Sequence, residues 1–368
     1  MQKPSAEPDE RDERDAPKER LASPEPPARS ALHLDAVTGA LARIAGLVRP
    51  KVRNTLGDLG VYEGLPVEEL FPAPRGVPAM RWSPRWRVPG MESEQLAFPS
   101  QHDPLEPTFR KHWHARRRRM HTVTARRLRP AGAHGRPRLL YIHGYMQPET
   151  WVEEVTLLAA LARTLDMEVV QLQPPYHGSR KPRSSRFDGE LYWTADLVRS
   201  MESLRQSLLD ARTLLAWMRA ESDTPVGICG LSLGGSLAAA LSCLEPGFAF
   251  SAPFIAHMDV GALVVDAPVL GAMREDLRRF GWEPERVGEW MERTGWNALR
   301  PVLPRERIHL FAGRDDLFFR PQLVEDLWRA WGEPEITWYP CSHMGFLPHL
   351  PDALARLRRF VDERVVTG

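Results

Sequence analysis

The stretch PVGICGLSLGGSLAAAL, residues 225–241, decides the fold. It opens with a short apolar run, which is typical of a buried strand, and closes with small helix-forming residues. The motif GLSLG at residues 230–234 joins the two halves. Gly230 and Gly234 allow a tight strand-to-helix turn, because no side chains crowd it. The sequence therefore predicts that Ser232 is an exposed nucleophile on a strained turn, rather than a serine that only caps a helix.

Short apolar runs alternate with helical patterns on both sides of this stretch. The predicted strands are 139–142, 168–172, 226–229, 248–255, 308–312 and 336–339. The predicted helices are 153–165, 194–219, 235–244, 322–331 and 351–365. Such alternation predicts an α/β fold with a mostly parallel central sheet and helices on both of its faces.

The serine turn in this setting resembles the α/β-hydrolase superfamily, and the likeness extends over residues 120–366. The segment LYIHGY at 140–145 is similar to the superfamily's strand that ends in His-Gly. Two further segments, PPYHGSR at 174–180 and FDGELYWTADL at 187–197, are similar to the narrower abhydrolase-domain-containing protein 18 family. The resemblance implies the α/β-hydrolase fold and the chain order nucleophile, acid, histidine.

The resemblance implies an acid after the next-to-last strand. The segment GRDD at 313–316 stands there, and the superfamily's G-x-x-D pattern selects Asp316. Asp315 remains an alternative, and Asp266 is a more distant one. The role of the acid is to hold a histidine in one tautomer and to stabilise its charged form.

The resemblance also implies a histidine base after the last strand. His343 lies in the loop between that strand and the final helix. The other histidine of this loop, His349, is too near the helix to be preferred. Ser232, Asp316 and His343 are therefore the predicted catalytic residues.

Two loops are expected to surround the serine. The resemblance assigns the oxyanion hole to the backbone N–H groups of Leu233 and Tyr145, with Met146 as second choice. Further candidates for lining the pocket are His143, Gly144, Met146, Tyr176 and His177. Of these, His143 is expected to fix its loop rather than to react, and Tyr176 and His177 could equally be structural.

A helical segment, 257–305, interrupts the alternation between two strands. We interpret it as a short lid insert over the carboxyl ends of the strands. Its beginning, GALVVDAPVLGAM at 261–273, is too apolar for an exposed loop. These residues either pack on the domain or form an apolar acyl pocket.

These features predict a serine hydrolase that cleaves a carboxylic ester or thioester through an acyl-enzyme. The expected partner is a small acyl ester, and no metal or organic cofactor is implied. An acyltransferase with the same three residues is one alternative, since sequence does not reveal the second nucleophile. A non-catalytic binding protein of the same fold is another, although it has no need of all three residues.

The bulk composition is that of an ordinary globular protein. The chain carries 49 Lys and Arg against 48 Asp and Glu, and a net charge of +1 predicts no partner by itself. Three cysteines form neither a disulfide framework nor a zinc pattern, so reduced thiols are expected. The N-terminus lacks a signal-peptide core, and no apolar run is long enough for a membrane span. A cytoplasmic protein is expected.

The N-terminal third differs from the rest. Residues 1–30 are charged and rich in proline, which predicts a disordered tail. Residues 31–115 are interpreted as an extension made of a helix and an irregular segment, followed by the hydrolase domain at 116–366. The apolar residues of the predicted helix recur at helical spacing: Leu34, Val37, Leu41, Ile44 and Val48. This helix is expected to pack on the domain or, alternatively, to cap a site.

The stretch 110–129 is strongly basic, with Arg116–Arg119 at its centre. A nucleic-acid surface is one interpretation. The favoured one is a solvated edge strand, because the whole chain is nearly neutral and no nucleic-acid-binding motif accompanies it. No nucleic acid is therefore expected as a partner.

Overall fold

The structure is a computed structural model of the 368-residue chain. It describes residues 34–41, 59–88, 90–116, 118–130, 135–148 and 153–364. The tail predicted at 1–30 lies outside the described residues, as do Ile44 and Val48.

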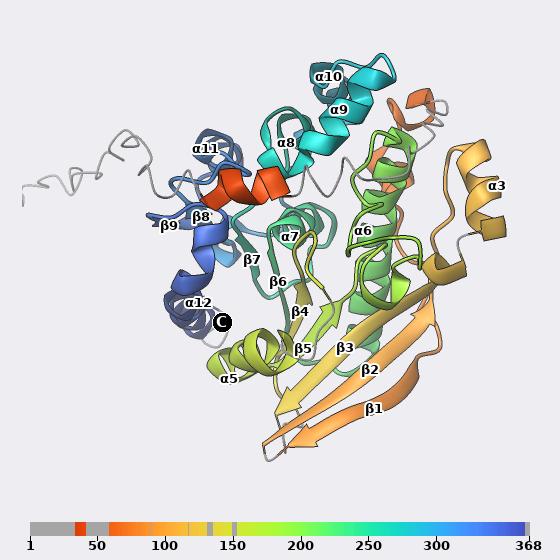
Figure 1. Cartoon of the computed structure of the whole chain (residues 1–368). Coiled ribbons are helices and arrows are strands. Elements are labelled where there is room, and N and C mark those ends of the chain that lie inside the picture. The colour runs from red at the N-terminus through yellow and green to blue at the C-terminus, as the bar shows by residue number, and fades with distance from the viewer. Residues whose placement is uncertain are drawn as a thin grey trace, which may run out of the picture.

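A nine-stranded sheet runs through the described residues in the order β1-β2-β3-β5-β4-β6-β7-β8-β9 (Figure 1). Its strands are β1 (Arg81–Val88), β2 (Met91–Pro99), β3 (Thr122–Pro130), β4 (Arg138–Ile142), β5 (Glu168–Leu172), β6 (Val226–Leu231), β7 (Ser251–Phe254), β8 (His309–Gly313) and β9 (Glu335–Tyr339). The first three strands and β5 pair antiparallel in turn, and the strands from β5 to β9 are parallel. The prediction of a mostly parallel sheet is confirmed.

Helices cover both faces of the sheet. They are π-helical η3 (Glu154–Leu158), α5 (Ala159–Leu165) and α12 (Leu350–Arg364) on one face, and α6 (Leu197–Glu221), α7 (Leu233–Leu244) and α11 (Pro321–Ala330) on the other. Strand β4 shows why both faces need cover, because it is apolar at every position from 139 to 142. Leu139 and Tyr141 join the core under α5 and α12, whereas Leu140 and Ile142 join the core under α6 and α7. Within the described residues, none of the helices has the length and apolar composition to cross a bilayer.

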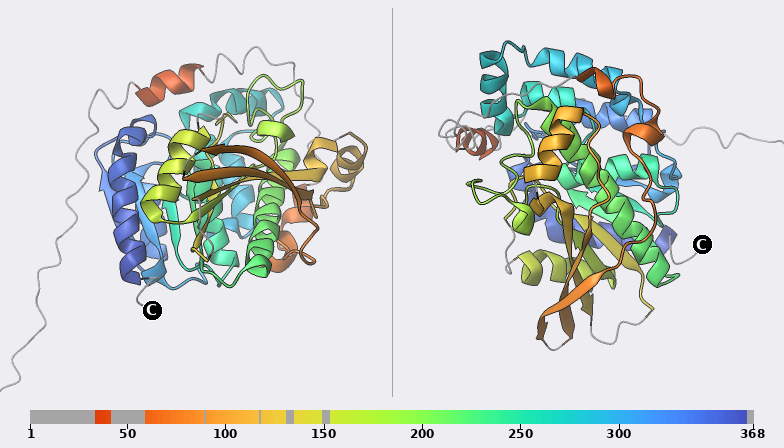
Figure 2. Two further views of the ribbon diagram at one scale, coloured as in Figure 1. Left: turned by 90° about the horizontal axis from the view of Figure 1, so that it is seen from below. Right: turned by 90° about the vertical axis from the view of Figure 1, so that its right-hand side faces the viewer.

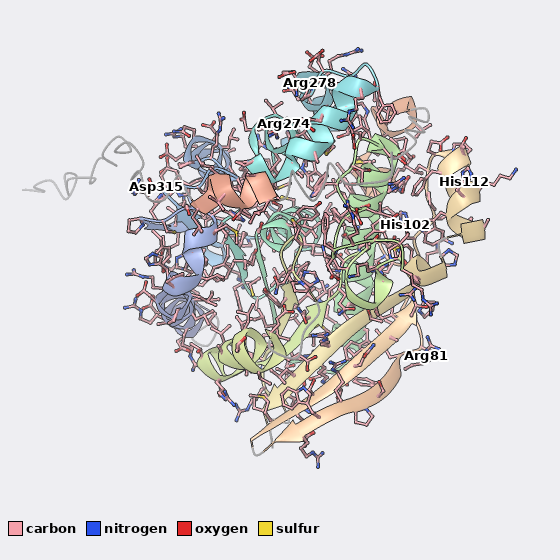
Figure 3. The ribbon with its side chains drawn as sticks, in the orientation of Figure 1. Arg81, His102, His112, Arg274, Arg278 and Asp315 are labelled. Atoms are coloured by element: carbon pink, nitrogen blue, oxygen red, sulfur yellow. The ribbon has the colours of Figure 1, made fainter. Side chains whose placement is uncertain are left out.

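The predicted lid segment is helical and folds over one end of the sheet. Its elements are α8 (Val260–Asp266), η5 (Pro268–Leu270), α9 (Gly271–Arg279), α10 (Glu285–Arg293) and η6 (Trp296–Ala298). Arg274 of α9, labelled in Figure 3, donates to the carbonyl oxygens of Val264 and Ala267 at 3.0 and 2.8 Å. Trp296 is fully buried and donates to the carbonyl oxygen of Met258. These bonds attach the parts of the lid segment to one another.

The structure corrects the expectation of an irregular segment before residue 116. Strands β1 and β2 form a hairpin that pairs with β3 and extends the main sheet. The prolines concealed this pairing, since Pro84 sits at an irregularity of the outermost strand, where a missing N–H is tolerated. The remaining elements of this region are η1 (Leu59–Tyr62), α2 (Val67–Leu70), α3 (Pro107–Arg116) and η2 (Arg118–His121). The boundaries at residues 30 and 116 stay predictions.

The basic stretch also differs from the expected solvated edge strand. Strand β3 lies between β2 and β5, so it is internal. Arg126 and Arg127 are buried, with Arg126 paired to Glu154 at 3.0 Å and Arg127 to Glu168 at 2.8 Å. The positive charges of Arg126 and Arg127 are therefore neutralised inside the protein.

Candidate active site

Ser232 lies on the sharp turn between β6 and α7. Its backbone has φ 57° and ψ −117°. This conformation is energetically unfavourable for any residue that has a side chain. A Cβ atom at Gly230 would collide with the carbonyl of Gly234, and one at Gly234 would collide with the carbonyl of Ile142. Glycine at these two positions is thus required by the close approach of the backbone, as the motif predicts.

The turn lies where the strand order of the sheet reverses. Strand β4 has β5 on one side and β6 on the other, so the loops after β4 and β6 leave in opposite directions. A crevice forms at such a point at the carboxyl ends of the strands. Ser232 follows β6, and residues 143–148 follow β4.

The side chains of Ser232, His343 and Asp316 form one hydrogen-bonded chain. Nε2 of His343 is 3.0 Å from Oγ of Ser232, and Nδ1 of His343 is 2.8 Å from Oδ2 of Asp316. Asp316 and His343 are buried, with 2% and 6% of their surface exposed. The aromatic rings of Phe318 and Phe319 stack on the imidazole at centroid distances of 4.6 and 5.3 Å. This chain can pass a proton from the serine to the imidazole.

The geometry separates the three candidate acids. Asp316 uses its second oxygen, Oδ1, to accept from the backbone N–H groups of Phe318 and Phe319 at 2.7 and 2.8 Å. Asp315 is half-buried and lies at the outer side of the molecule in Figure 3. Asp266 pairs with Arg320 at 3.0 Å. Of these three acids, Asp316 is the one that contacts the imidazole.

The predicted oxyanion loop adjoins the serine. A Cβ atom at Gly144 would come within 3.5 Å of Cβ of Ser232, so the two loops are in close contact. Tyr145, Met146 and Leu233 all line the same cavity as Ser232. Leu233 is the first residue of α7, and the first amides of a helix have no intrahelical acceptor. Met146 has φ 62°, which marks a strained turn in this loop.

A cavity of about 530 Å³ opens beside Ser232. Most of its lining is apolar, and the lid contributes Val260, Leu263, Val269, Leu270 and Trp296. Other apolar lining residues are Leu157, Trp193, Leu204, Ile255, Phe318, Phe319, Met344, Phe346 and Leu347. A cavity of this size and character suits an apolar group of a small ligand.

Three predicted pocket residues do not line this cavity. His143, Tyr176 and His177 are buried, and the rings of His143 and His177 lie 5.0 Å apart. Nδ1 of His177 donates to the carbonyl oxygen of Pro175, and burial holds the pKa of His177 well below its usual value. These residues pack beneath the loops that follow β4 and β5 rather than against the cavity. Gly144 and Met146 do line the cavity.

His257 is a cavity residue that sequence reasoning missed. Its Nδ1 accepts from the backbone N–H of Asp259 at 3.0 Å, so the ring proton of the neutral form resides on Nε2. Burial, with the nearby His343, lowers the pKa of His257 to about 3. One local signal in the sequence could have pointed to His257. The predicted lid begins at residue 257, directly after a predicted strand, and this places the histidine at the end of that strand.

Helix 34–41 also reaches the site. Thr38 lines the cavity, and the carboxylate of Asp35 accepts from the backbone N–H of His343 at 2.9 Å. The expected apolar face of this helix is turned outward, with Leu34, Val37 and Leu41 about half exposed or more. The helix therefore packs through its polar and small residues, contrary to the sequence pattern.

Known proteins similar to this chain agree with the fold. Residues 121–266 match the family described as alpha/beta hydrolase domain containing 18. The uncharacterized protein Rv2627c of Mycobacterium tuberculosis is 31% identical over 233 residues, which cover 61% of this chain and 53% of that protein. The match thus spans about half the length of that curated relative.

Two solved structures share the architecture. Acetyl xylan esterase 1 from Thermoanaerobacterium sp. JW/SL YS485 is 17% identical, with a TM-score of 0.51 over 80% of this chain and 99% of the esterase. A prolyl endopeptidase is 16% identical, with a TM-score of 0.50 over 75% of this chain and 37% of the peptidase. At these identities the likeness concerns the fold alone.

Proposed function

We propose that the chain is a serine hydrolase that cleaves a carboxylic ester or thioester through an acyl-enzyme on Ser232. The match of residues 121–266 to the alpha/beta hydrolase domain family and the shared fold support this proposal. The observation that carries the proposal is the hydrogen-bonded chain from Ser232 through His343 to Asp316. A nucleophile, a base and a residue that orients the base are the three parts of this mechanism.

In the first step, Oγ of Ser232 attacks the carbonyl carbon of the ester. Nε2 of His343 takes the hydroxyl proton, and Asp316 stabilises the imidazolium that forms. The C–O bond to the alcohol then breaks, and the imidazolium returns its proton to the leaving oxygen. The acyl group remains as an ester of Ser232.

The oxyanion of the tetrahedral intermediate needs donors that are already in place. We assign this role to the N–H groups of Leu233 and Tyr145, whose residues line the cavity beside Ser232. Each donor of this kind contributes about a hundredfold to a thousandfold in rate. In the second step, His343 deprotonates a water molecule, which attacks the acyl carbon. The bond from this carbon to Oγ of Ser232 then breaks, the imidazolium returns its proton to Oγ, and the acid leaves.

The cavity supports an apolar acyl group as the bound part of the substrate. Its volume of about 530 Å³ and its apolar walls give an acyl chain a place out of water. Burying each methylene there contributes about 0.8 kcal/mol.

The proposal is tested with a fluorophosphonate probe and nitrophenyl esters of graded length. The wild-type protein should be labelled and should hydrolyse the esters, whereas Ser232→Ala should do neither. Ser242→Ala is a matched control, because Ser242 lies on the same helix but bonds Ser251 and Ala238 in the core. Undiminished labelling of Ser232→Ala would overturn the assignment of the nucleophile.

A further inference from the structure

Asp35 connects the N-terminal region to the loops of the active site. Oδ2 accepts from the backbone N–H of Leu317 at 3.2 Å and of His343 at 2.9 Å. Oδ1 accepts from the backbone N–H of Met344 at 2.9 Å. We propose that Asp35 is a positioning residue, whose carboxylate holds the His343 loop against the Asp316 loop. This inference rests on the proposed function.

The contacts of Asp35 are suited to fixing a distance. The carboxylate is fully buried, and the three donors that it has among the described residues are main-chain N–H groups. Hydrogen bonds to a charged acceptor are about twice as strong as neutral ones. Since backbone amides move only with their loop, these bonds restrain the loops themselves.

One oxygen atom joins the two loops that carry the acid and the base. Leu317 directly follows Asp316, so its N–H group moves with the loop that carries Asp316. His343 supplies the other N–H to the same oxygen. The 2.8 Å contact between His343 and Asp316 therefore depends on a separation that Asp35 sets. Asp35 acts through these residues and does not itself touch the Ser232 hydroxyl.

The packing of helix 34–41 agrees with an anchoring role for Asp35. Figures 1 and 2 show this helix, in red, outside the sheet and beside the lid helices. A Cβ atom at Gly39 would collide with Pro268 of η5, so the helix lies directly against the lid. Its apolar residues face outward, with Val37 55% exposed. Hydrophobic burial thus contributes little to its attachment, and the bonds of Asp35 are correspondingly important.

Substitution of Asp35 should misplace the base without emptying the cavity. In Asp35→Asn one acceptor oxygen becomes an NH₂ group, which would face a backbone N–H donor. At least one of the three hydrogen bonds of Asp35 is lost, and the new NH₂ group points at a backbone N–H group that is also a donor. Asp35→Ala removes all three bonds and leaves buried N–H groups without acceptors. Val37→Ala, an exposed change on the same helix, is the matched control.

The experiment measures fluorophosphonate labelling over time in the full chain, together with kcat and KM on a nitrophenyl ester. For Asp35→Asn we expect labelling at least tenfold slower and kcat lowered by a similar factor. KM should stay within twofold, and the final labelled fraction should equal that of the wild type. Val37→Ala should match the wild type throughout.

Two outcomes would overturn the inference. In one, Asp35→Asn is labelled as fast as Val37→Ala. In the other, the final labelled fraction falls while the rate of the remainder is unchanged, which would mean that Asp35 serves only folding.

A readout independent of activity separates this inference from the proposed function. The proton between His343 and Asp316 should give a downfield proton NMR signal, identified by its loss in Asp316→Asn. This signal should shift or broaden in Asp35→Asn and stay unchanged in Val37→Ala. If the wild type is not labelled but the signal responds in this way, the proposed function fails and the positioning role stands. An unaltered signal in Asp35→Asn contradicts the positioning role itself.

Discussion

Two buried carboxylates, Glu154 and Asp316, occupy opposite kinds of surroundings. Glu154 pairs with the guanidinium groups of Arg85 and Arg126 at 2.9 and 3.0 Å. It also accepts from the indole N–H of Trp86 and the hydroxyl of Ser93. Within the described part of the chain Asp316 pairs with no guanidinium, and it bonds an imidazole and two backbone amides.

The difference between the two sites lies in where each network ends. The Glu154 network is closed in the sense that two cations neutralise its charge and that none of the residues named above lines the cavity beside Ser232. The Asp316 network leads through His343 to a hydroxyl that lines a cavity of about 530 Å³. A buried charge with matched cations serves structure, whereas a buried charge at the end of an open chain can serve chemistry. Burial alone does not distinguish the two.

The largest expected effect tests the network of Asp316, His343 and Ser232, which is open because it ends at the cavity. Asp316→Asn should lower kcat for ester hydrolysis by about a thousandfold or more, because the imidazole loses its orienting carboxylate. Asp315→Asn is the neighbouring control and should change kcat by no more than a few fold. Steady-state kinetics on one nitrophenyl ester checks both. The reverse ranking would move the acid to Asp315.

A smaller effect is expected when the closed network is broken. Glu154→Gln should lower the free energy of unfolding by about 3–5 kcal/mol, because it leaves the buried guanidinium group of Arg126 without a full partner. Asp362→Asn, which removes an exposed pair with Arg358, should change it by less than about 1 kcal/mol. Denaturant unfolding measures both values. If Glu154→Gln instead lowered kcat while stability was kept, the contrast between the two networks would be wrong.

The smallest effect concerns the cavity at the end of the open network. In the wild type, kcat/KM should rise by about fourfold for each methylene from acetate to hexanoate esters. Leu263→Trp should fill part of the cavity and move the optimum to a shorter chain. Leu263→Met keeps the side-chain volume and should leave the profile as it is. If kcat/KM does not change with chain length in any of the three proteins, the lid residues only pack on the domain and do not bind the acyl chain.

Local signals in the sequence were sufficient for the α/β pattern and for Ser232. The strand Glu168–Leu172 was predicted at its observed bounds, because a short apolar run between turns has few alternatives. The Ser232 turn was predictable for a steric reason, since only glycine fits at 230 and 234. His343 followed from the resemblance, which places the histidine base after the last strand.

Other features depended on contacts between distant parts of the chain. Adjacent carboxylates at 315 and 316 are chemically equal, and only the direction of each side chain decides which of them meets His343. The hairpin of β1 and β2 required β3 as a partner before its proline-containing strands could be recognised.

Asp35 is the clearest case in which the tertiary structure decided. The spacing of Leu34, Val37 and Leu41 by itself determined that a helix forms, and it predicted that this face would be buried. The structure buries Asp35 instead, through a hydrogen bond to a residue 308 positions away. Periodicity encodes which residues share a face of a helix, but the surface that receives the helix decides which face turns inward. Here that surface offers three backbone N–H donors, and a carboxylate satisfies them where a leucine could not.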